Sequence, residues 1–265
     1  MQKVEVINVS KRFYKTNNDS QETLVLDNIS FEVEAGTFFS ILGPSGCGKS
    51  TLINMIAGFF KPTKGEIRFN SKLIDAPSPE RTVVFQEYGL FDWKTVLGNV
   101  EFGLKAKSLP KNKRKEITQY YIDLVNLTGA ENKYPHELSG GMKQRAAIAR
   151  ALAVNPECLL MDEPFGAIDS QTRNFLQDEI LEIWRKTRKT ILSITHNIDE
   201  AVYLSDRVII LSSSPAKVIS DINIDLPRPR FPEVRLESKF RAIYDSIWQI
   251  LRKEVLKSKF KDENN

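Results

Sequence analysis

A glycine-rich run between two apolar segments places the tightest limit on what this chain can fold into. The run has the spacing G-x-x-x-x-G-K-[ST] and comprises Gly43, Pro44, Ser45, Gly46, Cys47, Gly48, Lys49, Ser50 and Thr51. Residues 38–42 before it predict a strand, and the helix after it is expected to end at Gly58. Glycines let successive backbone N–H groups turn toward an anion, and the helix N-terminus adds positive charge. The run therefore predicts a phosphate-binding loop in which Lys49 reaches the β- and γ-phosphates and the Ser50 hydroxyl binds Mg²⁺.

Two adjacent carboxylates form the second motif. Asp162 and Glu163 follow the apolar residues 158–161, and Pro164 ends the run. Paired acidic residues usually lie on exposed surfaces, but the apolar residues before these two indicate the end of a buried strand. There Asp162 can hold Mg²⁺ directly or through water, and Glu163 can polarise the attacking water as a general base. A phosphate loop and a carboxylate pair on one chain predict a nucleoside triphosphatase.

Composition excludes several other classes. With 265 residues, 41% of them hydrophobic and 27% charged, the chain has the composition of a soluble globular protein. No apolar run approaches the roughly 20 residues that span a bilayer, and residues 1–6 lack a signal-peptide core, so we expect a cytoplasmic protein. Cys47 and Cys158 give neither a disulfide framework nor zinc spacing, and a net charge of +4 is too mild to indicate nucleic acid.

Apolar strands alternate with amphipathic helices along the chain, which predicts an α/β fold. The expected strands are residues 4–9, 29–33, 38–42, 65–69, 83–86, 159–161, 190–195, 208–211 and 217–224. Residues from about 90 to 155 show helical periodicity instead, with an apolar face formed by Ile117, Tyr120, Tyr121, Leu124 and Val125. We expect a nucleoside triphosphatase domain over residues 1–225, with this helical subdomain inserted into it. Residues 226–265 are expected to form a tail with an amphipathic helix, whose apolar positions are Phe240, Ile243, Tyr244, Ile247, Leu251 and Val255.

A third string lies between the two motifs: Leu138-Ser139-Gly140-Gly141-Met142-Lys143-Gln144-Arg145. The order of the three motifs, over roughly residues 4–225, resembles the ATP-binding cassette (ABC) ATPases. The resemblance implies a P-loop NTPase fold with a RecA-like core, an antiparallel β subdomain and an inserted helical subdomain. It also implies that Ser139, Gly140 and Gly141 contact the γ-phosphate of ATP held by the opposite subunit of a homodimer. A hydroxyl and close N–H groups at a helix N-terminus suit that role.

The same resemblance implies roles for four further side chains. Phe13, with Tyr14 as the neighbouring alternative, matches the aromatic residue that stacks on adenine. Gln86 matches the glutamine that approaches Mg²⁺ and leads to the transporter contact, and His196 matches the histidine that touches the γ-phosphate. Asp169 matches the loop that communicates across the dimer. Taken alone, Phe13 also fits a core aromatic and Gln86 a solvent-facing strand end.

The spacing of the motifs and the number of cassettes indicate which branch of the ABC family the chain resembles. Ser139 follows Lys49 by 90 residues, without the long coiled coil of DNA-repair members, and there is one cassette and no membrane span. We therefore expect a peripheral subunit on the cytoplasmic face of the inner or plasma membrane. Its permease partners are separate chains, and a periplasmic or extracellular solute-binding protein acts indirectly.

Residues 88–96, the string Leu226-Pro227-Arg228-Pro229-Arg230 and the short tail resemble the importer ATPases for nitrate, sulfonates and taurine. Residues 86–100 are expected to contact the permease, where Trp93 is either an anchor or part of the subdomain core. The alternatives are an exporter or lipid-extraction ATPase subunit, or a non-transport ABC protein acting on ribosomes or DNA.

Overall fold

A computed structural model describes residues 4–14, 22–166 and 168–262. The chain divides into two compact units. The first comprises Met1–Pro77 and Leu192–Asn265, and the second comprises Ser78–Ile191. Within the described residues, no helix has both the length and the apolar character that crossing a membrane requires.

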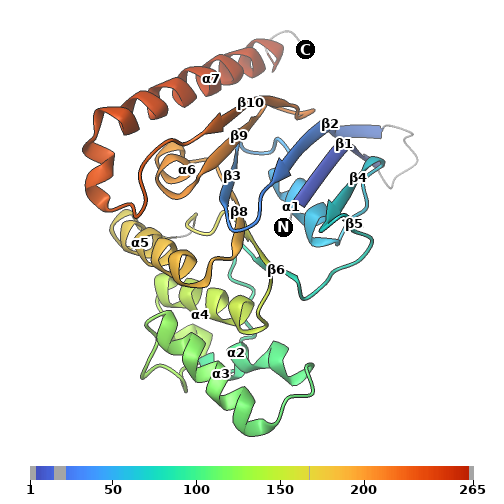
Figure 1. Ribbon diagram of the computed structural model, residues 1–265. Helices are drawn as coiled ribbons and strands as arrows, with labels where there is room; N and C mark the ends of the chain where they lie inside the picture. Colours follow the sequence, from blue (N-terminus) through green and yellow to red (C-terminus); the bar gives the residue numbers. More distant parts are fainter. Residues whose placement is uncertain (1–3, 15–21, 167, 263–265) are drawn as a thin grey trace. The chain divides into compact units, whose positions relative to one another are not determined.

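The first unit contains a four-stranded antiparallel sheet and strands of a second sheet (Figure 1). Its elements are β1 (Val4–Tyr14), β2 (Glu22–Val33), β3 (Phe38–Leu42), α1 (Lys49–Ala57), β4 (Lys64–Phe69), β5 (Lys72–Leu73), the end of β8 (Thr190–Thr195), α6 (Ile198–Leu204), β9 (Arg207–Leu211), β10 (Val218–Asn223), η2 (Pro232–Leu236) and α7 (Ser238–Asp262). The antiparallel sheet has the order β2-β1-β4-β5, and β9 pairs with β3 in parallel and with β10 antiparallel.

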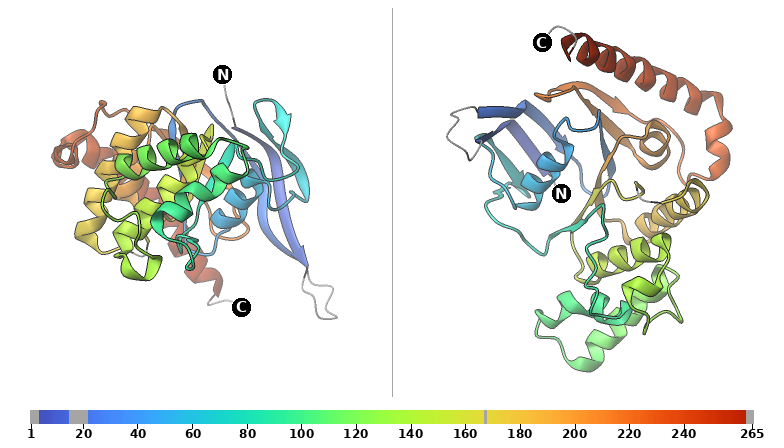
Figure 2. Two further views of the ribbon diagram at one scale, coloured as in Figure 1. Left: turned by 90° about the horizontal axis from the view of Figure 1, so that it is seen from below. Right: turned by 180° about the vertical axis from the view of Figure 1, so that it is seen from behind.

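Burial explains why these strands differ in sequence. All five residues of β3 are buried, as expected for a parallel strand covered on both faces. In β1 buried and exposed positions are mixed, as in an antiparallel strand with one solvated face. β1 extends well beyond the predicted residues 4–9, because Phe13 pairs with Thr23 and Tyr14 with Glu22 in the long ladder with β2. Both views in Figure 2 show β1, β2 and β4 as one curved sheet with α1 beside it.

The second unit consists mainly of helices. Its elements are β6 (Arg81–Val84), α2 (Val96–Lys105), α3 (Lys111–Leu124), η1 (Pro135–Glu137), α4 (Gly140–Ala153), β7 (Cys158–Asp162) and α5 (Ser170–Thr187). β6 and β7 pair in parallel, with Val84 opposite Met161. Residues 90–155, all of which are described, contain helices and no strand, so the helical character predicted for them is confirmed.

One detail of the helical prediction is wrong. The side chain of Tyr120 is 57% exposed, whereas Thr118 and Ile122 are fully buried in α3. The apolar pattern predicted the wrong buried face for α3, because Thr118 occupies a core position and a search for apolar residues passes over a threonine.

The tail is an amphipathic helix, as predicted, and α7 packs against α6 (Figures 1 and 2). Phe240 and Ile247 of α7 are buried. Val255, assigned to the same face by the sequence pattern, is exposed. The carboxylate of Glu254 is buried beside it, because the backbone N–H and the hydroxyl of Ser213 both donate to Glu254 Oε1 at 3.3 and 3.0 Å.

Candidate functional site

The glycine-rich run of the first unit forms a loop from the end of β3 to the start of α1. Gly48 has φ of 112°, and a Cβ there would lie 2.8 Å from Val25 Cγ1, so only glycine fits. α1 begins at Lys49, and its N-cap, Gly48, has no side chain that could cap the first N–H groups. The N–H groups at the start of this nine-residue helix form an anion-binding end.

Lys49 is the charged group of this loop. Its side chain is only 4% exposed, and Nζ donates to the backbone carbonyls of Gly43 at 2.9 Å and Pro44 at 2.8 Å. The loop's own carbonyls thus hold the ammonium group inside the loop. Ser50 is exposed at the next position. For the other residues of the run, Gly43 and Cys47 are buried, Pro44, Gly48 and Thr51 are half-buried, and Ser45 and Gly46 are exposed.

The carboxylate pair of the second unit lies where the sequence predicts, at the end of β7. The four strand residues before Asp162 are buried, and Asp162 itself is half-buried. Glu163 follows in a left-handed conformation with φ of 46°, which is uncommon for glutamate, and the N–H of Gly166 donates to its carbonyl at 3.0 Å. Strained backbone of this kind clusters at functional sites, because the surrounding fold holds it in place.

Gln86 and Glu163 converge on one glycine. A Cβ placed on Gly166 would lie 3.5 Å from Gln86 Nε2 and 3.7 Å from Glu163 Oε2. Gln86 sits in an exposed turn rather than at a strand end, since β6 stops at Val84. The structure therefore brings together two predicted site residues from segments far apart in sequence. Gly166 was not identified as a site residue from the sequence. Its one signal there is that it is a glycine two residues after Pro164.

The third string begins helix α4. Ser139 is the N-cap, and its Oγ accepts from the N–H of Met142 at 3.3 Å. That bond uses the hydroxyl oxygen as an acceptor and leaves its proton for another acceptor. Gly140 is the first helical residue and is half-buried, and Gly141 is buried, where a Cβ would meet Thr172 Cγ2 at 2.8 Å. Helix α4 therefore approaches α5 closely at a point where only glycine fits.

Asp169 caps the helix that Gly141 faces. Its carboxylate accepts from the backbone N–H of Thr172 at 3.0 Å, at the start of α5. Hydrogen bonds from Thr172 lower the pKa of Asp169 below its ordinary value, so the cap is ionised at neutral pH.

His196 and Phe13 belong to the first unit. His196 is exposed directly after β8, and β8 neighbours β3, the strand that leads into the phosphate loop. Phe13 is 38% exposed on β1, edge-on to Phe60 with ring centroids 6.3 Å apart. Lys11 Nζ lies 5.2 Å from the centre of the Phe13 ring, within cation–π range. Sequence reasoning missed Phe60, which no motif marks. The neighbouring Tyr14 is more exposed.

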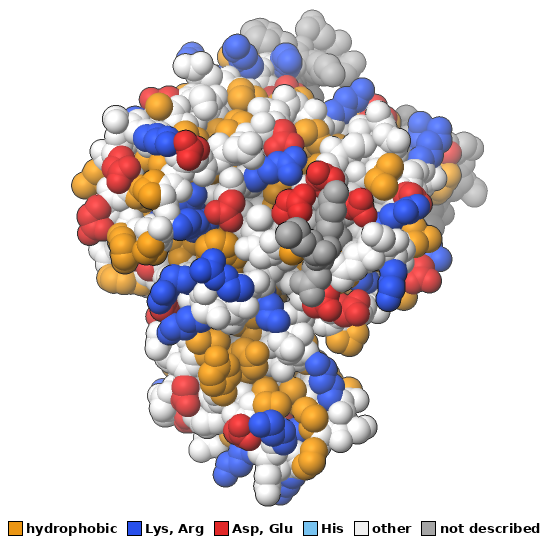
Figure 3. Space-filling model, viewed as in Figure 1, with side chains coloured by type: hydrophobic (Ala, Val, Ile, Leu, Met, Phe, Trp, Pro, Cys, Tyr) orange, Lys and Arg blue, Asp and Glu red, His pale blue; other side chains and the backbone are white. Residues whose placement is uncertain are grey.

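An exposed aromatic cluster forms around residues 91–102 of the second unit. The ring of Phe91 lies 5.3 Å from that of Trp93 and 4.5 Å from that of Phe102. Trp93 is 73% exposed, so the alternative that it belongs to the subdomain core is wrong. Figure 3 shows hydrophobic side chains gathered on the surface of helices α2–α4.

Asn99 holds the loop that presents these rings. Its side chain is fully buried and accepts from the N–H of Phe91 at 2.8 Å. Its amide donates to the carbonyls of Phe91, Lys94 and Thr95 at 3.2, 3.1 and 3.0 Å. The buried side chain of Asn99 makes four hydrogen bonds to the backbone of residues 91–95, which form no helix or strand. These bonds hold the backbone that carries Trp93 in place.

Comparisons with known proteins agree with these motifs. The family model described as "ABC transporter" matches residues 26–166. An uncharacterized ABC transporter ATP-binding protein of Methanocaldococcus jannaschii is 49% identical, over 97% of this chain and 94% of its own. The nitrate transport protein NasD of Klebsiella oxytoca is 43% identical over 96% and 94%, and the nitrate import ATP-binding protein NrtD of Synechococcus elongatus is 44% identical over 81% and 79%.

Solved structures show the same architecture. A dimeric ATP-binding cassette in a post-hydrolysis state with ADP and Pi matches with a TM-score of 0.74 and 30% identity, over 84% of this chain and all of that one. The cassette cbiO1 of Clostridium perfringens, part of the transporter complex cbiONQ, also has a TM-score of 0.74, with 26% identity over 94% and 97%. The phosphate loop, the carboxylate pair and the Ser-Gly-Gly helix start are thus the motifs of an ATP-binding cassette, and the chain belongs to the ATP-binding subunits of ABC transporters.

Proposed function

We propose that this chain is the ATPase subunit of an importer for a small solute, working as a homodimer on separate permease subunits. The observation that carries the transport role is the rigid, exposed aromatic cluster around Trp93, next to the Gln86 turn. An apolar surface with a buried support is typical of a protein contact. Relatives at 43–44% identity are named for nitrate import and nitrate transport, which supports nitrate or a similar small solute as the substrate.

The residues of the phosphate loop bind the triphosphate. The N–H groups at the start of α1 and the ammonium of Lys49 meet phosphate oxygens, while Phe13 stacks on the adenine. The hydroxyl of Ser50, the carboxylate of Asp162 and the amide oxygen of Gln86 are hard oxygen donors, which fit Mg²⁺. When bound, the ion neutralises charge on the β- and γ-phosphate oxygens.

Hydrolysis is assigned to Glu163 and His196. Glu163 orients the attacking water and accepts its proton, and the imidazole of His196 contacts the γ-phosphate. Ser139, Gly140 and Gly141 offer a hydroxyl and N–H groups to the ATP of the partner cassette. ATP then binds the closed dimer better than the open one, and only such a difference in affinity can drive the permease. Hydrolysis reopens the dimer.

Replacing Ser139 tests the action of the third string across the dimer. Ser139→Ala removes the N-cap of α4, which costs about 1 kcal/mol of stability, and the proton offered to the partner's ATP. We expect turnover to fall about tenfold or more, while the monomer binds ATP as before. Equilibrium binding of a fluorescent ATP analogue below the dimerisation concentration separates the two effects. Weaker binding by the monomer contradicts a role in trans. Thr95→Ala, which removes the N-cap of α2 in the same unit, is the control for helix destabilisation when turnover is measured without the permease.

Trp93 is expected to carry much of the permease contact. Trp93→Ala should weaken binding to the permease by about 2 kcal/mol, or about thirtyfold, because a rigid aromatic anchor is lost. Trp93→Phe should retain most of it. Tyr120→Ala, which removes an exposed aromatic from α3, is the matched control. Retention of the permease on the immobilised variants, measured by titration in detergent, gives the affinities. Wild-type retention by Trp93→Ala contradicts the assignment.

One experiment separates the transport role from its alternatives. Tagged Glu163→Gln protein, expressed in its native cells and extracted in detergent with Mg-ATP, is purified, and its partners are identified by mass spectrometry. A multi-span permease without its own cassette, together with a solute-binding protein, is the expected result. A permease without a binding protein favours the exporter alternative. Ribosomal or DNA-maintenance proteins without a permease overturn the importer.

A further inference from the structure

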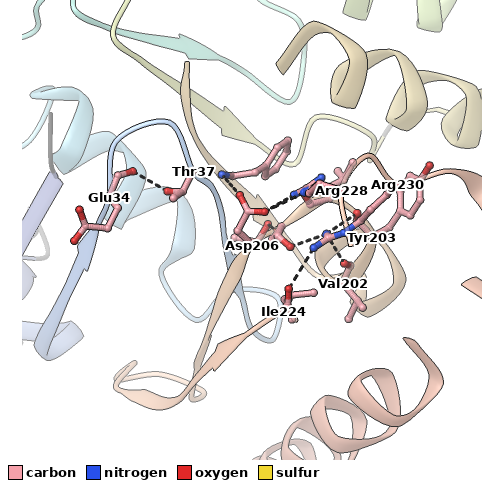
Figure 4. Close-up of polar contacts among 12 residues, drawn as sticks. Glu34, Thr37, Val202, Tyr203, Asp206, Ile224, Arg228 and Arg230 are labelled. Carbon is pink, nitrogen blue, oxygen red and sulfur yellow. Dashed lines mark hydrogen bonds and ion pairs between the residues drawn. The ribbon is translucent and has the colours of Figure 1, made fainter. Parts of the chain in front are cut away.

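Two arginines of the string 226–230, Arg228 and Arg230, donate hydrogen bonds to carbonyls at the C-terminal end of helix α6. Arg230 Nη1 donates to the carbonyls of Val202, Tyr203 and Ser205 at 3.1, 2.9 and 2.7 Å, and its Nη2 donates to that of Ile224 at 3.3 Å. Figure 4 shows this guanidinium at the end of α6. The last carbonyls of a helix have no partners within the helix, so the guanidinium supplies donors that would otherwise be missing.

The charge of Arg230 also suits this place. A cation is favoured at a helix C-terminus, and Arg230 is only 6% exposed. Burial, together with the positive charge of Arg228, lowers the pKa of Arg230 to about 9. The side chain therefore stays protonated at neutral pH.

Arg228 joins the same helix end to the strand of the phosphate loop. Its Nη2 donates to the carbonyl of Leu204 at 2.6 Å, and its Nε and Nη2 donate to Asp206 Oδ1 at 3.0 and 2.8 Å. The other oxygen of Asp206 accepts from the N–H of Phe38 at 2.9 Å, and the N–H of Asp206 donates to the Phe38 carbonyl at 2.7 Å. Phe38 is the first residue of β3, which runs into the phosphate loop.

A third arginine holds the side of the helix. The guanidinium of Arg235 lies 3.6 Å from the centre of the Tyr203 ring, and its Nε donates to Asp199 in the first turn of α6 at 3.0 Å. Arg228, Arg230 and Arg235, which we call the arginine clamp, thus contact α6 at both ends.

His196 immediately precedes this helix. Asn197 is the N-cap of α6, where its side chain accepts from the N–H of Glu200 at 3.2 Å, and its own N–H donates to Thr195 Oγ1 at 3.0 Å. His196 is therefore fixed between the end of β8 and the start of α6. Isolated helices of seven residues are not stable in water, so the position of α6 depends on what holds it.

We propose that Arg228 and Arg230 are positioning residues for ATP hydrolysis, which act through α6 on His196. The inference rests on the proposed role of His196. It gives the string 226–230 a function in the ATPase cycle rather than only a place before the tail helix. A loosened α6 displaces the imidazole of His196. A misplacement of about 1 Å in a reacting group can cost about 10²-fold in rate, so a small displacement is enough to slow hydrolysis.

A double-mutant cycle between Arg230 and His196 tests the proposal. Turnover, KM for ATP, ATP binding and thermal unfolding are measured for Arg230→Ala, Arg230→Lys, His196→Ala and the double variant, well below their unfolding temperatures. We expect Arg230→Ala to lower kcat about tenfold or more with little change in KM or binding, and Arg230→Lys to recover part of the loss. The double variant should be no slower than His196→Ala, because both changes remove the same contribution. Arg241→Ala removes an exposed arginine of α7 and should behave as wild type.

Three other outcomes would contradict the proposal. If the two losses multiply, or if Arg230→Ala loses ATP binding as much as turnover, the clamp is only structural and the inference fails. If His196→Ala turns over at the wild-type rate, the proposed role of His196 fails first, and the inference with it. Should Arg230→Ala not fold, the same cycle is run with Arg228→Gln, which keeps an amide donor but not the ion pair with Asp206.

Discussion

Glu163→Gln is expected to lower ATP turnover by about 10²–10⁴-fold while leaving ATP bound. Glutamine has nearly the same shape as glutamate but cannot accept a proton from the attacking water. The left-handed turn at residue 163 is held through the backbone, by the N–H of Gly166 on the carbonyl of Glu163, and this bond survives the substitution. The variant should therefore fold normally and accumulate as an ATP-bound dimer.

The measurements are steady-state turnover, binding of Mg-ATP and the oligomeric state with ATP by size-exclusion chromatography. Glu182→Gln is the matched control, because it makes the same change at a surface ion pair with Arg185 on α5 of the same unit. Unchanged turnover in Glu163→Gln removes this residue from the role of general base. Equal losses in both variants point to a nonspecific effect.

Lys49→Ala is expected to weaken Mg-ATP binding about 10- to 100-fold, since a hydrogen bond to a charged group contributes about 1.5–3 kcal/mol. Turnover at saturating ATP should fall a further 10²–10³-fold, because the lost cation faces the phosphate oxygens where negative charge develops. The buried ammonium donates to the backbone carbonyls of Gly43 and Pro44, and the N–H groups at the start of α1 do not depend on this side chain.

Isothermal titration with Mg-ATP and turnover assays check both effects. Lys72→Ala, on the exposed strand β5 of the same unit, controls for the loss of one positive charge. A thermal unfolding curve distinguishes a lost ligand contact from a damaged loop. Wild-type affinity in Lys49→Ala contradicts the assignment of this side chain to the phosphates.

Local patterns were enough to predict most elements. The strand Phe38–Leu42, the helix from Lys49 to Ala57 and the strand that ends in Asp162 all lie where periodicity and glycine placement put them. Each depends on neighbours within a few residues, through helix starts, left-handed glycines and runs of apolar side chains. The roles of the individual site residues stay predictions, which the substitutions above test.

Contacts between distant segments escaped prediction. The sequence pattern ended the first strand at residue 9, although pairing with β2 carries it to Tyr14. It left Trp93 open between core and surface, because the loop around it is fixed by Asn99 rather than by any periodic pattern. A single buried amide with four partners has no signature in sequence.

The family could be predicted from the sequence, because the glycine-rich run, the carboxylate pair and the Ser-Gly-Gly string are each contiguous and need particular residues at fixed spacing. Tertiary structure alone decided which separate segments meet. It placed Gln86 and Glu163 around Gly166, and it put Arg230 on the last carbonyls of α6, 25 residues earlier at Ser205. The physical reason is that hydrogen-bonding groups at a helix end or in a turn accept any suitably placed donor, and only the folded chain decides which donor that is.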